Sequence, residues 1–378
     1  MSNNEKIEPL TTPPTQSAET NTPTSSQFSP VSFNFHGNSS EFFGIWIVNV
    51  LLTIVTLGIY SAWAKVRTNQ YFYGNTELDS HRFAYLAKPL DILKGRIIAV
   101  LLFGGYSFLS AVYPIAGAIF AIILMILSPW LICVSMRFNL RMTSYRNVRF
   151  NFTGKYLHAF LYLFILPIVG LFTFGLAFPF VLCKIDKFLL SNVQYGDKQL
   201  DADIGAEQYY ITFLIMMCVG GAIGMAFGLI GTVVGGMFGL SLEDFAEGES
   251  TLNASISIML IVGMGLYLLF ITAMSAYYQA TIRNYILNNT TLEDVAKFTS
   301  HYKIMSFMML LFTNLLAVVF SFGLAYPWVK VRSTQYAITH TDVYLTNNKD
   351  NIIDLLGEQS TALGDEVANV FDVDVALI

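Results

Sequence analysis

Residues 57–67 have the sequence LGIYSAWAKVR, and a related segment with the same Gly, Trp, Lys, Val and Arg returns at residues 322–332 as FGLAYPWVKVR. A weaker copy, FGLAFPFVLCK, occupies residues 174–184. Every copy stands at the end of an apolar run, and further apolar runs separate the copies. Recurrence of one motif along a chain predicts an architecture built from internal repeats.

The three copies belong to longer repeat units. Residues 33–78 align with residues 298–343 without a gap, and residues 150–195 form a weaker third unit that begins with FNFTG where the first has FNFHG. Chance similarity between apolar segments can match Leu and Phe, but hardly polar and aromatic residues in register. The identities of that polar or aromatic kind include His36/His301, Asn49/Asn314, Trp63/Trp328, Lys65/Lys330, Arg67/Arg332, Gln70/Gln335, Tyr71/Tyr336 and Thr76/Thr341.

The composition is that of a membrane protein. Charged residues make up 12% of the chain and hydrophobic residues 54%, with a mean hydropathy of +0.55, whereas soluble domains carry about 25% charged residues. Several apolar runs reach the roughly 20 residues that span a bilayer as a helix. We therefore expect an all-α membrane protein with about seven transmembrane helices and three internal repeat units. Nucleic-acid binding is not expected.

Three parts are expected along the chain. Residues 1–32 are rich in Ser, Thr and Pro and are expected to be a disordered tail. Residues 33–346 form the polytopic membrane domain. Residues 347–378 form an acidic soluble tail with a short amphipathic helix near 362–371. Residues 33–37 alternate aromatic and polar side chains, which is typical of a short strand or an interfacial segment.

Two membrane topologies stay open. If every motif helix crosses, the chain has seven crossings, and some of its Lys and Arg residues lie outside. If the motif helices dip and return, all 21 Lys and Arg residues lie on one side, as the positive-inside rule prefers. The unbroken helical pattern of residues 42–57 favours seven crossings, with the C-terminus in the cytoplasm, and this is the expectation that we adopt.

The motif itself has the features of an interfacial anchor. Gly58 and Gly323 stand where a helix ends and are expected to cap it. Aromatic rings at the headgroup level anchor helix ends, and nearby basic residues bind lipid phosphate. The candidate residues for anchoring or for binding an anionic lipid are Trp63, Lys65, Arg67, Trp328, Lys330 and Arg332.

Two amides lie in the middle of apolar runs. A buried amide in lipid needs a partner, so Asn49 and Asn314 are expected to hydrogen-bond with each other across helices, or to line a solute path. The Gly-rich run 210–240 has small residues four apart, including Gly224 and Gly228, which predicts close helix packing. His36 and His301 lack a third ligand in register, so no metal site is expected.

No catalytic motif is present. The sequence has no GxSxG, HExxH, Walker or dinucleotide-binding motif. Its three cysteines, Cys133, Cys183 and Cys218, lie in apolar surroundings without ligand spacing. We expect neither an enzyme nor a cofactor.

The motifs carry a resemblance to a known family. The segment LLTIVTLGIYSAWAKVRTNQYFYGNTELDSHRFAY, with FNFHG before it and PLDILKGR after it, resembles the YjgN family of bacterial inner-membrane proteins. SYRNVRFNFTG and YPWVKVRSTQY resemble later blocks of that family, so the likeness covers nearly all of residues 33–345. The family has no characterised activity. The resemblance therefore implies a multi-pass protein of the inner membrane and supplies no catalytic residue. The unit at residues 150–195 departs from the pattern where FVLCK replaces WxKVR.

Two functions stay open at this point. One is a transporter or channel-like protein for a small solute or lipid, because repeats and mid-span amides occur in transporters. The other is a scaffold or envelope-maintenance protein that transports nothing. The expected partners are the lipid bilayer and either an anionic lipid or a small solute.

Overall fold

The chain is described by a computed structural model that covers residues 29–237 and 254–346, without the side chains of 234–237 and 254–260. The expected N-terminal tail up to residue 28 and the acidic C-terminal tail lie outside the described residues, and so does the part of the Gly-rich run from residue 238 on. Residues 29–32, assigned above to the tail, belong to a strand.

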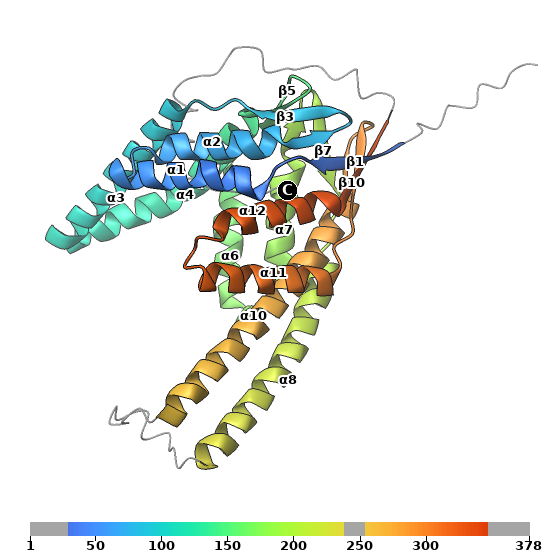
Figure 1. The fold of residues 1–378 in the computed structure, drawn as a ribbon. Helices are drawn as coiled ribbons and strands as arrows, with labels where there is room; N and C mark the ends of the chain where they lie inside the picture. Colours follow the sequence, from blue (N-terminus) through green and yellow to red (C-terminus); the bar gives the residue numbers. More distant parts are fainter. Residues whose placement is uncertain (1–28, 238–253, 347–378) are drawn as a thin grey trace, which may run out of the picture.

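Short strands form a closed barrel (Figure 1). Each strand pairs with its neighbours along the chain, and the first pairs antiparallel with the last, Val31 opposite Val343. The strands are β1 (Ser29–Phe35), β2 (Thr76–Leu78), β3 (His81–Tyr85), β4 (Thr143–Tyr145), β5 (Val148–Phe152), β6 (Val193–Tyr195), β7 (Lys198–Ala202), β8 (Thr290–Leu292), β9 (Ala296–Ser300) and β10 (Thr341–Leu345).

Helix pairs connect alternate strands of the barrel. The helices are α1 (Ser39–Val55), α2 (Ser61–Gly74), α3 (Pro89–Val112), α4 (Pro114–Arg141), α5 (Tyr156–Phe160), the π-helical η1 (Leu161–Ile165), α6 (Leu166–Phe172), α7 (Phe178–Ser191), α8 (Glu207–Met237), α10 (Ala254–Asn288), α11 (Ile304–Phe320) and α12 (Tyr326–Thr339). We call α1–α2, α5–α7 and α11–α12 the short pairs, and α3–α4 and α8–α10 the long pairs. The two long pairs leave the barrel in different directions (Figure 1).

Tight turns make the remaining connections between strands. Asp79 and Ser80 join β2 to β3 with φ of 49° and 61°, and Arg146 and Asn147 join β4 to β5 with φ of 48° and 64°. Two consecutive residues with positive φ are the mark of the type I′ turn, whose twist suits a two-residue hairpin. The barrel therefore alternates between tight turns at one end and helix pairs at the other.

Apolar side chains fill the barrel. Its core cluster includes Tyr145, Tyr195, Leu292 and Val343, all at most 8% exposed. The tyrosine hydroxyls donate to strand carbonyls, Tyr145 to that of Leu78 at 2.8 Å and Tyr195 to that of Tyr145 at 2.9 Å. Small barrels are filled by side chains in this way, so the interior is a core rather than a pore.

The helix pairs form a ring, because each pair contacts the next. The ring closes where α12 packs against α1. Every seam between neighbouring pairs has a buried cluster of its own: Phe42, Tyr71 and Val331 fill the seam between α1–α2 and α11–α12. The three repeat units predicted from the sequence occupy corresponding elements of this ring, each consisting of a strand, the two arms of a short pair and a second strand.

Four long helices of the structure correspond to the membrane-spanning helices expected from the sequence. Within the described ranges, the helices long and apolar enough to cross a membrane are Pro89–Val112, Pro114–Arg141, Glu207–Val233 and Ile261–Asn288. The shorter apolar helices Ser39–Val55, Tyr156–Phe172 and Ile304–Phe320 belong to the short pairs. Beside the expected helices, the structure has strands, of which the sequence indicated only the one at residues 33–37. Strands of three to five residues are too short to show a clear period of two.

Two local features concern a proline and two glycines. The π-helical turn Leu161–Ile165 ends two residues before Pro167 of α6. The close packing expected at Gly224 and Gly228 was wrong. A Cβ added at either glycine would meet nothing within 4 Å, because these residues lie on an open face of α8.

Candidate functional site

The tips of the three short pairs share one backbone turn. In the first, Leu57 and Gly58 have φ of 51° and 93°. The Gly58 N–H donates to the Thr53 carbonyl at 2.8 Å and the Leu57 N–H to the Ile54 carbonyl at 3.1 Å. This is the Schellman pattern that ends helices, so the predicted caps at Gly58 and Gly323 are confirmed. The other copies have the same signs of φ: Phe174 (52°), Gly175 (86°), Phe322 (51°) and Gly323 (88°).

A bulky apolar residue occupies the left-handed position of each turn, where it costs roughly 1–2 kcal/mol compared with a right-handed conformation. These residues are almost fully exposed: Leu57 by 94%, Phe174 by 99% and Phe322 by 96%. The residues two before and two after each of them are also exposed and apolar: Val55, Ile59, Phe172, Leu176, Phe320 and Leu324. Strain and exposure at three equivalent tips indicate a surface made for an apolar environment.

A cation follows each tip, one and a half turns into the returning helix. The Arg332 guanidinium lies 4.9 Å from the centre of the Trp328 ring, and the Lys184 ammonium lies 5.3 Å from that of Phe180. Both pairs are four residues apart, so they share a helix face. Because Arg332 stands six residues after α12 begins, the tip extends about 9 Å beyond it.

The first copy arranges the same residue types differently. Arg67 donates to the Tyr60 hydroxyl at 3.2 Å, and the Tyr60 ring stacks on Trp63 with centroids 6.1 Å apart. Trp63 is half-buried against the seam with α3–α4, while Trp328 is 42% exposed. Lys65 is half-buried in α2. The two tryptophans predicted as equal anchors therefore differ: Trp63 packs within the ring, and Trp328 faces outward.

The last copy brings Arg332 and Asn314 together. Arg332 Nη1 donates to Thr313 Oγ1 at 2.7 Å and to Asn314 Oδ1 at 3.2 Å. Asn314, only 5% exposed, donates from Nδ2 to Ser333 Oγ at 3.0 Å. Among the described residues no carboxylate contacts Arg332, so its charge is held by neutral groups alone.

Asn49 has no hydrogen-bond partner. Its side chain is 4% exposed, and neither amide atom finds a partner among the described residues. The predicted bond between Asn49 and Asn314 was therefore wrong, because Asn314 is satisfied within its own helix pair. In the first copy Val48 replaces Thr313, so the hydroxyl that holds Arg332 in place has no counterpart beside Arg67.

A groove with both polar and apolar side chains in its lining lies where the last and first copies meet. Its volume is about 480 Å³, and it is lined by Ser39, Ser306, Met309, Leu310, Val331, Arg332, Gln335, Tyr336 and Thr339. The seam beside it is closed by Trp46 against Tyr326, with centroids 6.2 Å apart. The Lys330 ammonium lies 5.8 Å from the Phe72 ring. Of the six predicted anchor residues, the structure places only Arg332 in this groove.

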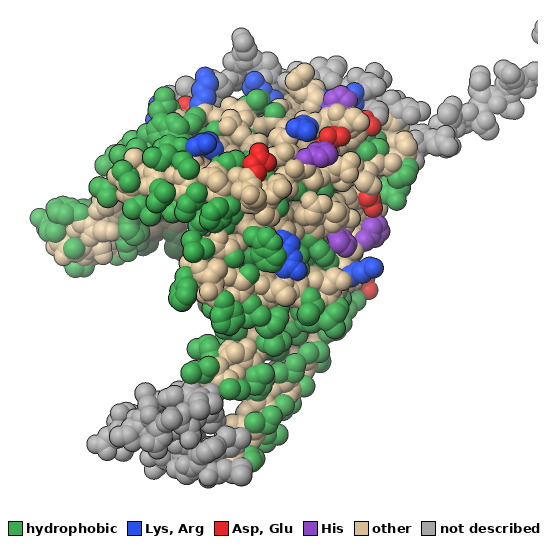
Figure 2. All heavy atoms as spheres, viewed as in Figure 1, with side chains coloured by type: hydrophobic (Ala, Val, Ile, Leu, Met, Phe, Trp, Pro, Cys, Tyr) green, Lys and Arg blue, Asp and Glu red, His purple; other side chains and the backbone are tan. Residues whose placement is uncertain are grey.

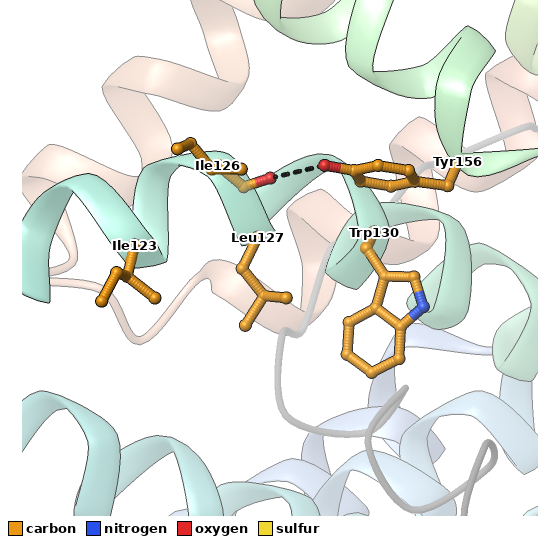
Figure 3. A pocket seen from close by; sticks show the side chains of 5 residues that line it. All are labelled: Ile123, Ile126, Leu127, Trp130 and Tyr156. Carbon is orange, nitrogen blue, oxygen red and sulfur yellow. Dashed lines mark hydrogen bonds between the residues drawn. The ribbon is translucent and has the colours of Figure 1, made fainter.

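A second, apolar pocket of about 430 Å³ lies between α4 and α5 (Figure 3). It is lined by Ile123, Ile126, Leu127, Trp130 and Tyr156. The Tyr156 hydroxyl donates to the Ile126 carbonyl at 3.3 Å, and Ser128 donates to the Met125 carbonyl at 2.8 Å. Pro129, inside α4, cannot donate to that Met125 carbonyl. Hydroxyls thus satisfy the backbone next to a proline, as they do in membrane helices.

Charge and apolar surface are separated on the molecule. In Figure 2 hydrophobic side chains cover the helices of the long pairs, while Lys, Arg, Asp, Glu and His gather over the barrel and the adjoining helix ends. The tips 56–60, 112–114, 173–177 and 321–325 contain no Lys or Arg. One end of the molecule is therefore suited to water and the other to lipid.

The barrel was not predicted from the sequence, although the sequence contains a signal for it. A threonine follows the helix at the start of four of the short strands, and its hydroxyl donates to the carbonyl four residues earlier. These threonines are Thr76, Thr143, Thr290 and Thr341. Each stands two residues before a buried residue of the barrel core: Leu78, Tyr145, Leu292 and Val343.

Residues 30–370 match the family described as "Bacterial protein of unknown function (DUF898)". The chain belongs to this family. It is 25% identical over 344 residues to "Inner membrane protein YjgN" of Salmonella typhimurium, covering 82% of this chain and 87% of that protein. The protein of that name from Escherichia coli O157:H7 is 24% identical over 365 residues, 85% of this chain and 90% of its own. That of E. coli K12 is 34% identical over 153 residues, 39% and 37% of the two chains.

No solved structure matches the chain. The resemblance to YjgN predicted from the motifs is confirmed. The name of these relatives, together with the four long apolar helices, places this DUF898 protein among bacterial inner-membrane proteins.

Proposed function

We propose that this DUF898 protein is a scaffold of the bacterial inner membrane that organises anionic lipids in the cytoplasmic leaflet. In this proposal the barrel and both chain termini lie in the cytoplasm. The long pairs cross the membrane, and the short pairs dip into it and return. The observation that carries the proposal is the triplicate tip, in which exposed apolar residues lie about 9 Å beyond a cation.

The closed barrel supports the four-crossing topology. Both ends of every helix pair are attached to strands of one barrel. A pair that begins and ends at the barrel returns to the side from which it came, so the number of crossings is even. Seven crossings would place β7 and β8 on the opposite side from β3 and β4, which one barrel does not allow.

Helix lengths support the same division. At 1.5 Å per residue, the 17 residues of α1 extend about 25 Å, whereas the 28 residues of α4 extend about 42 Å. The hydrocarbon core of a bilayer is about 30 Å thick. A short pair whose cations stay at the phosphates inserts only its tip, as interfacial helices do by about 5–10 Å.

Charge supports the orientation. The tips without Lys or Arg lie away from the barrel, and positively charged loops stay in the cytoplasm. The filled barrel supports a scaffold over a channel along its axis, since side chains such as Tyr145 and Val343 occupy the interior.

Two cysteine variants test this topology. We expect His81→Cys on β3 and Gln199→Cys on β7, both at exposed positions, to be protected from a membrane-impermeant maleimide in intact spheroplasts and to react after lysis. Seven crossings would expose only position 199 to the periplasm, and that labelling would overturn the proposal. The exposed native Cys218 is first replaced by Ser.

A second candidate function is transport of a small solute or lipid. Its support is Asn49, a buried amide without a partner in a helix that packs against α12, since unpaired polar groups inside membranes mark functional sites. Flux of labelled solutes or lipids across proteoliposomes tests it. Flux that the double variant Asn49→Leu/Asn314→Leu abolishes would favour a transporter over a scaffold.

A further inference from the structure

The groove between the last and first copies contains hydrogen-bond donors that the protein does not use. Guanidinium has five N–H groups. Arg332 directs Nη1 at Thr313 and Asn314, and within the described residues Nε and Nη2 have no hydrogen-bond partner. Ser39, Ser306 and Gln335 also line the groove, and no side-chain hydrogen bond to a described residue satisfies them. Such a set of donors suits an oxyanion.

Arg332 is held ready for that role. Trp328 supports one face of the guanidinium at 4.9 Å, and the hydroxyl of Thr313 and the amide of Asn314 fix its Nη1 edge. A planar guanidinium group that is already oriented loses little conformational entropy when it binds a ligand. It also matches the geometry of a phosphate better than an ammonium group does. The donors left over can then pair with two oxygens of one phosphate.

The groove runs from the barrel toward the apolar tips, and this orientation fits a phospholipid. Arg332 stands six residues into α12, while Ser39 and Thr339 stand at the helix ends next to the barrel. Toward the tip, α11 offers exposed Val319 and Phe320, and α1 offers exposed Val55. A headgroup in the groove would have its phosphate at Arg332, its polar part toward the barrel and its acyl chains along the apolar tips.

We propose that the groove binds the phosphate of an anionic phospholipid headgroup, with Arg332 as the main ligand and with Ser39, Ser306 and Gln335 completing the site. This inference rests on the proposed function, because it assumes that the short pairs dip into the lipid. It assigns one specific site to the seam of the ring. Arg67 does not make an equivalent site, because it is exposed and donates to Tyr60 instead.

A binding titration of the purified full-length protein in a non-ionic detergent tests the site. The probes are phosphatidylglycerol, diacylglycerol (which has acyl chains but no phosphate) and inorganic phosphate (which has no chains), with binding followed by native mass spectrometry and by the unfolding temperature. We expect phosphatidylglycerol to bind and to raise the unfolding temperature, and the other two to do neither. Arg332→Gln should weaken its binding by about 10- to 100-fold, as expected for loss of a charged hydrogen-bonding partner.

The matched control is Arg67→Gln, which removes the same charge from the first copy and should change the affinity less than twofold. Because Arg332→Gln also disturbs Asn314, Gln335→Ala provides a variant at an exposed position outside that network. It should weaken binding several-fold without changing the unfolding temperature of the lipid-free protein. Equal losses in Arg332→Gln and Arg67→Gln would overturn the proposal, and so would an unchanged affinity in Gln335→Ala.

Binding of inorganic phosphate as tightly as phosphatidylglycerol would also overturn it, in favour of a soluble anion. Binding of diacylglycerol as tightly as phosphatidylglycerol would overturn it in favour of an acyl-chain site. These readouts are independent of the labelling at positions 81 and 199. Failure of the lipid site and failure of the proposed topology can therefore be told apart.

Discussion

The first and last helix pairs repeat the same letters but use them differently. Asn314 is buried within a network that includes Arg332 and Ser333, while Asn49 is equally buried and has no hydrogen-bond partner. Arg332 is held by Thr313, while Arg67 reaches back to Tyr60. Residues that align without a gap therefore need not have equal roles.

The difference has a physical cause in the neighbours. Thr313 of the last copy is replaced by Val48 in the first. A valine offers no hydroxyl to a guanidinium, so Arg67 loses the partner that would hold it next to Asn49. The replacement of Thr313 by Val48 thus accompanies the change from a hydrogen-bonded network to an unpaired amide. Repeats preserve backbone shape more faithfully than they preserve side-chain contacts.

The tryptophans should give the largest contrast between the two copies. Trp63 packs against the buried cluster of Ala62, Val66 and Ile92, whereas Trp328 is 42% exposed. We expect Trp63→Ala to lower the free energy of unfolding in detergent by about 2–4 kcal/mol, because it leaves a cavity in a seam. Trp328→Ala should cost about 1 kcal/mol or less, since it removes mainly a cation–π contact.

Denaturant titrations of both variants measure the two free energies. Trp63→Phe, which keeps part of the packing, is the control and should lie between the wild type and Trp63→Ala. Equal losses for the two alanine variants would mean that both tryptophans act as surface anchors, as the sequence alone suggested.

Replacement of the two buried amides by Leu should change the free energy of unfolding differently. Asn314→Leu removes the partner of Arg332 and Ser333 and should cost about 1–3 kcal/mol of unfolding free energy. Asn49→Leu replaces an unsatisfied buried amide by an apolar side chain of similar size and should be neutral or stabilising. Thermal unfolding of both variants in the same detergent measures the difference. A large loss on Asn49→Leu would show that Asn49 has a partner in the folded membrane protein, such as water or a solute.

The tips are the part in which the copies agree. Gly58→Ala and Gly323→Ala should each cost about 1 kcal/mol, because both glycines have φ near +90°. Gly44→Ala in α1 is the matched control. Its Cβ would meet nothing within 4 Å, and an alanine inside a helix should stabilise it by about 0.5–1 kcal/mol. Unequal effects at the two tips, measured by thermal unfolding, would contradict the shared turn.

The sequence predicted those parts of the molecule that are encoded by long apolar runs or by repeated motifs. Apolar runs indicated the helices of the long pairs, and the repeated Leu-Gly and Phe-Gly steps marked the turns at residues 58 and 323. It could not reveal the barrel, because strands such as Thr76–Leu78 have three residues and their pairing joins distant segments. Nor could it show that Asn314 lies next to Arg332, since a hydrogen bond between two helices depends on how the pair is packed.

The smallest effect concerns the barrel, where the strand after the long pair α3–α4 differs from those after the first and last short pairs. Tyr145 of β4 stands two residues after Thr143, where the strands after the first and last short pairs have Leu78 and Val343. Burial raises the pKa of Tyr145 from 10.0 to about 12. The folded protein therefore holds this proton more tightly than the unfolded chain. Its contribution to stability is complete below pH 10 and is lost as the pH rises toward 12.

Tyr145→Phe tests this difference. At pH 8 the variant should be less stable by about 1 kcal/mol, because the hydrogen bond to the Leu78 carbonyl is lost. Phenylalanine does not ionise, so the gap in unfolding free energy should narrow between pH 10 and 12. Val343→Leu, an apolar change in the same core, should keep a constant gap from the wild type over this range. A gap that stays constant for Tyr145→Phe as well would mean that the hydroxyl is reached by water, and that the barrel is less tightly filled at β4 than at Leu78 and Val343.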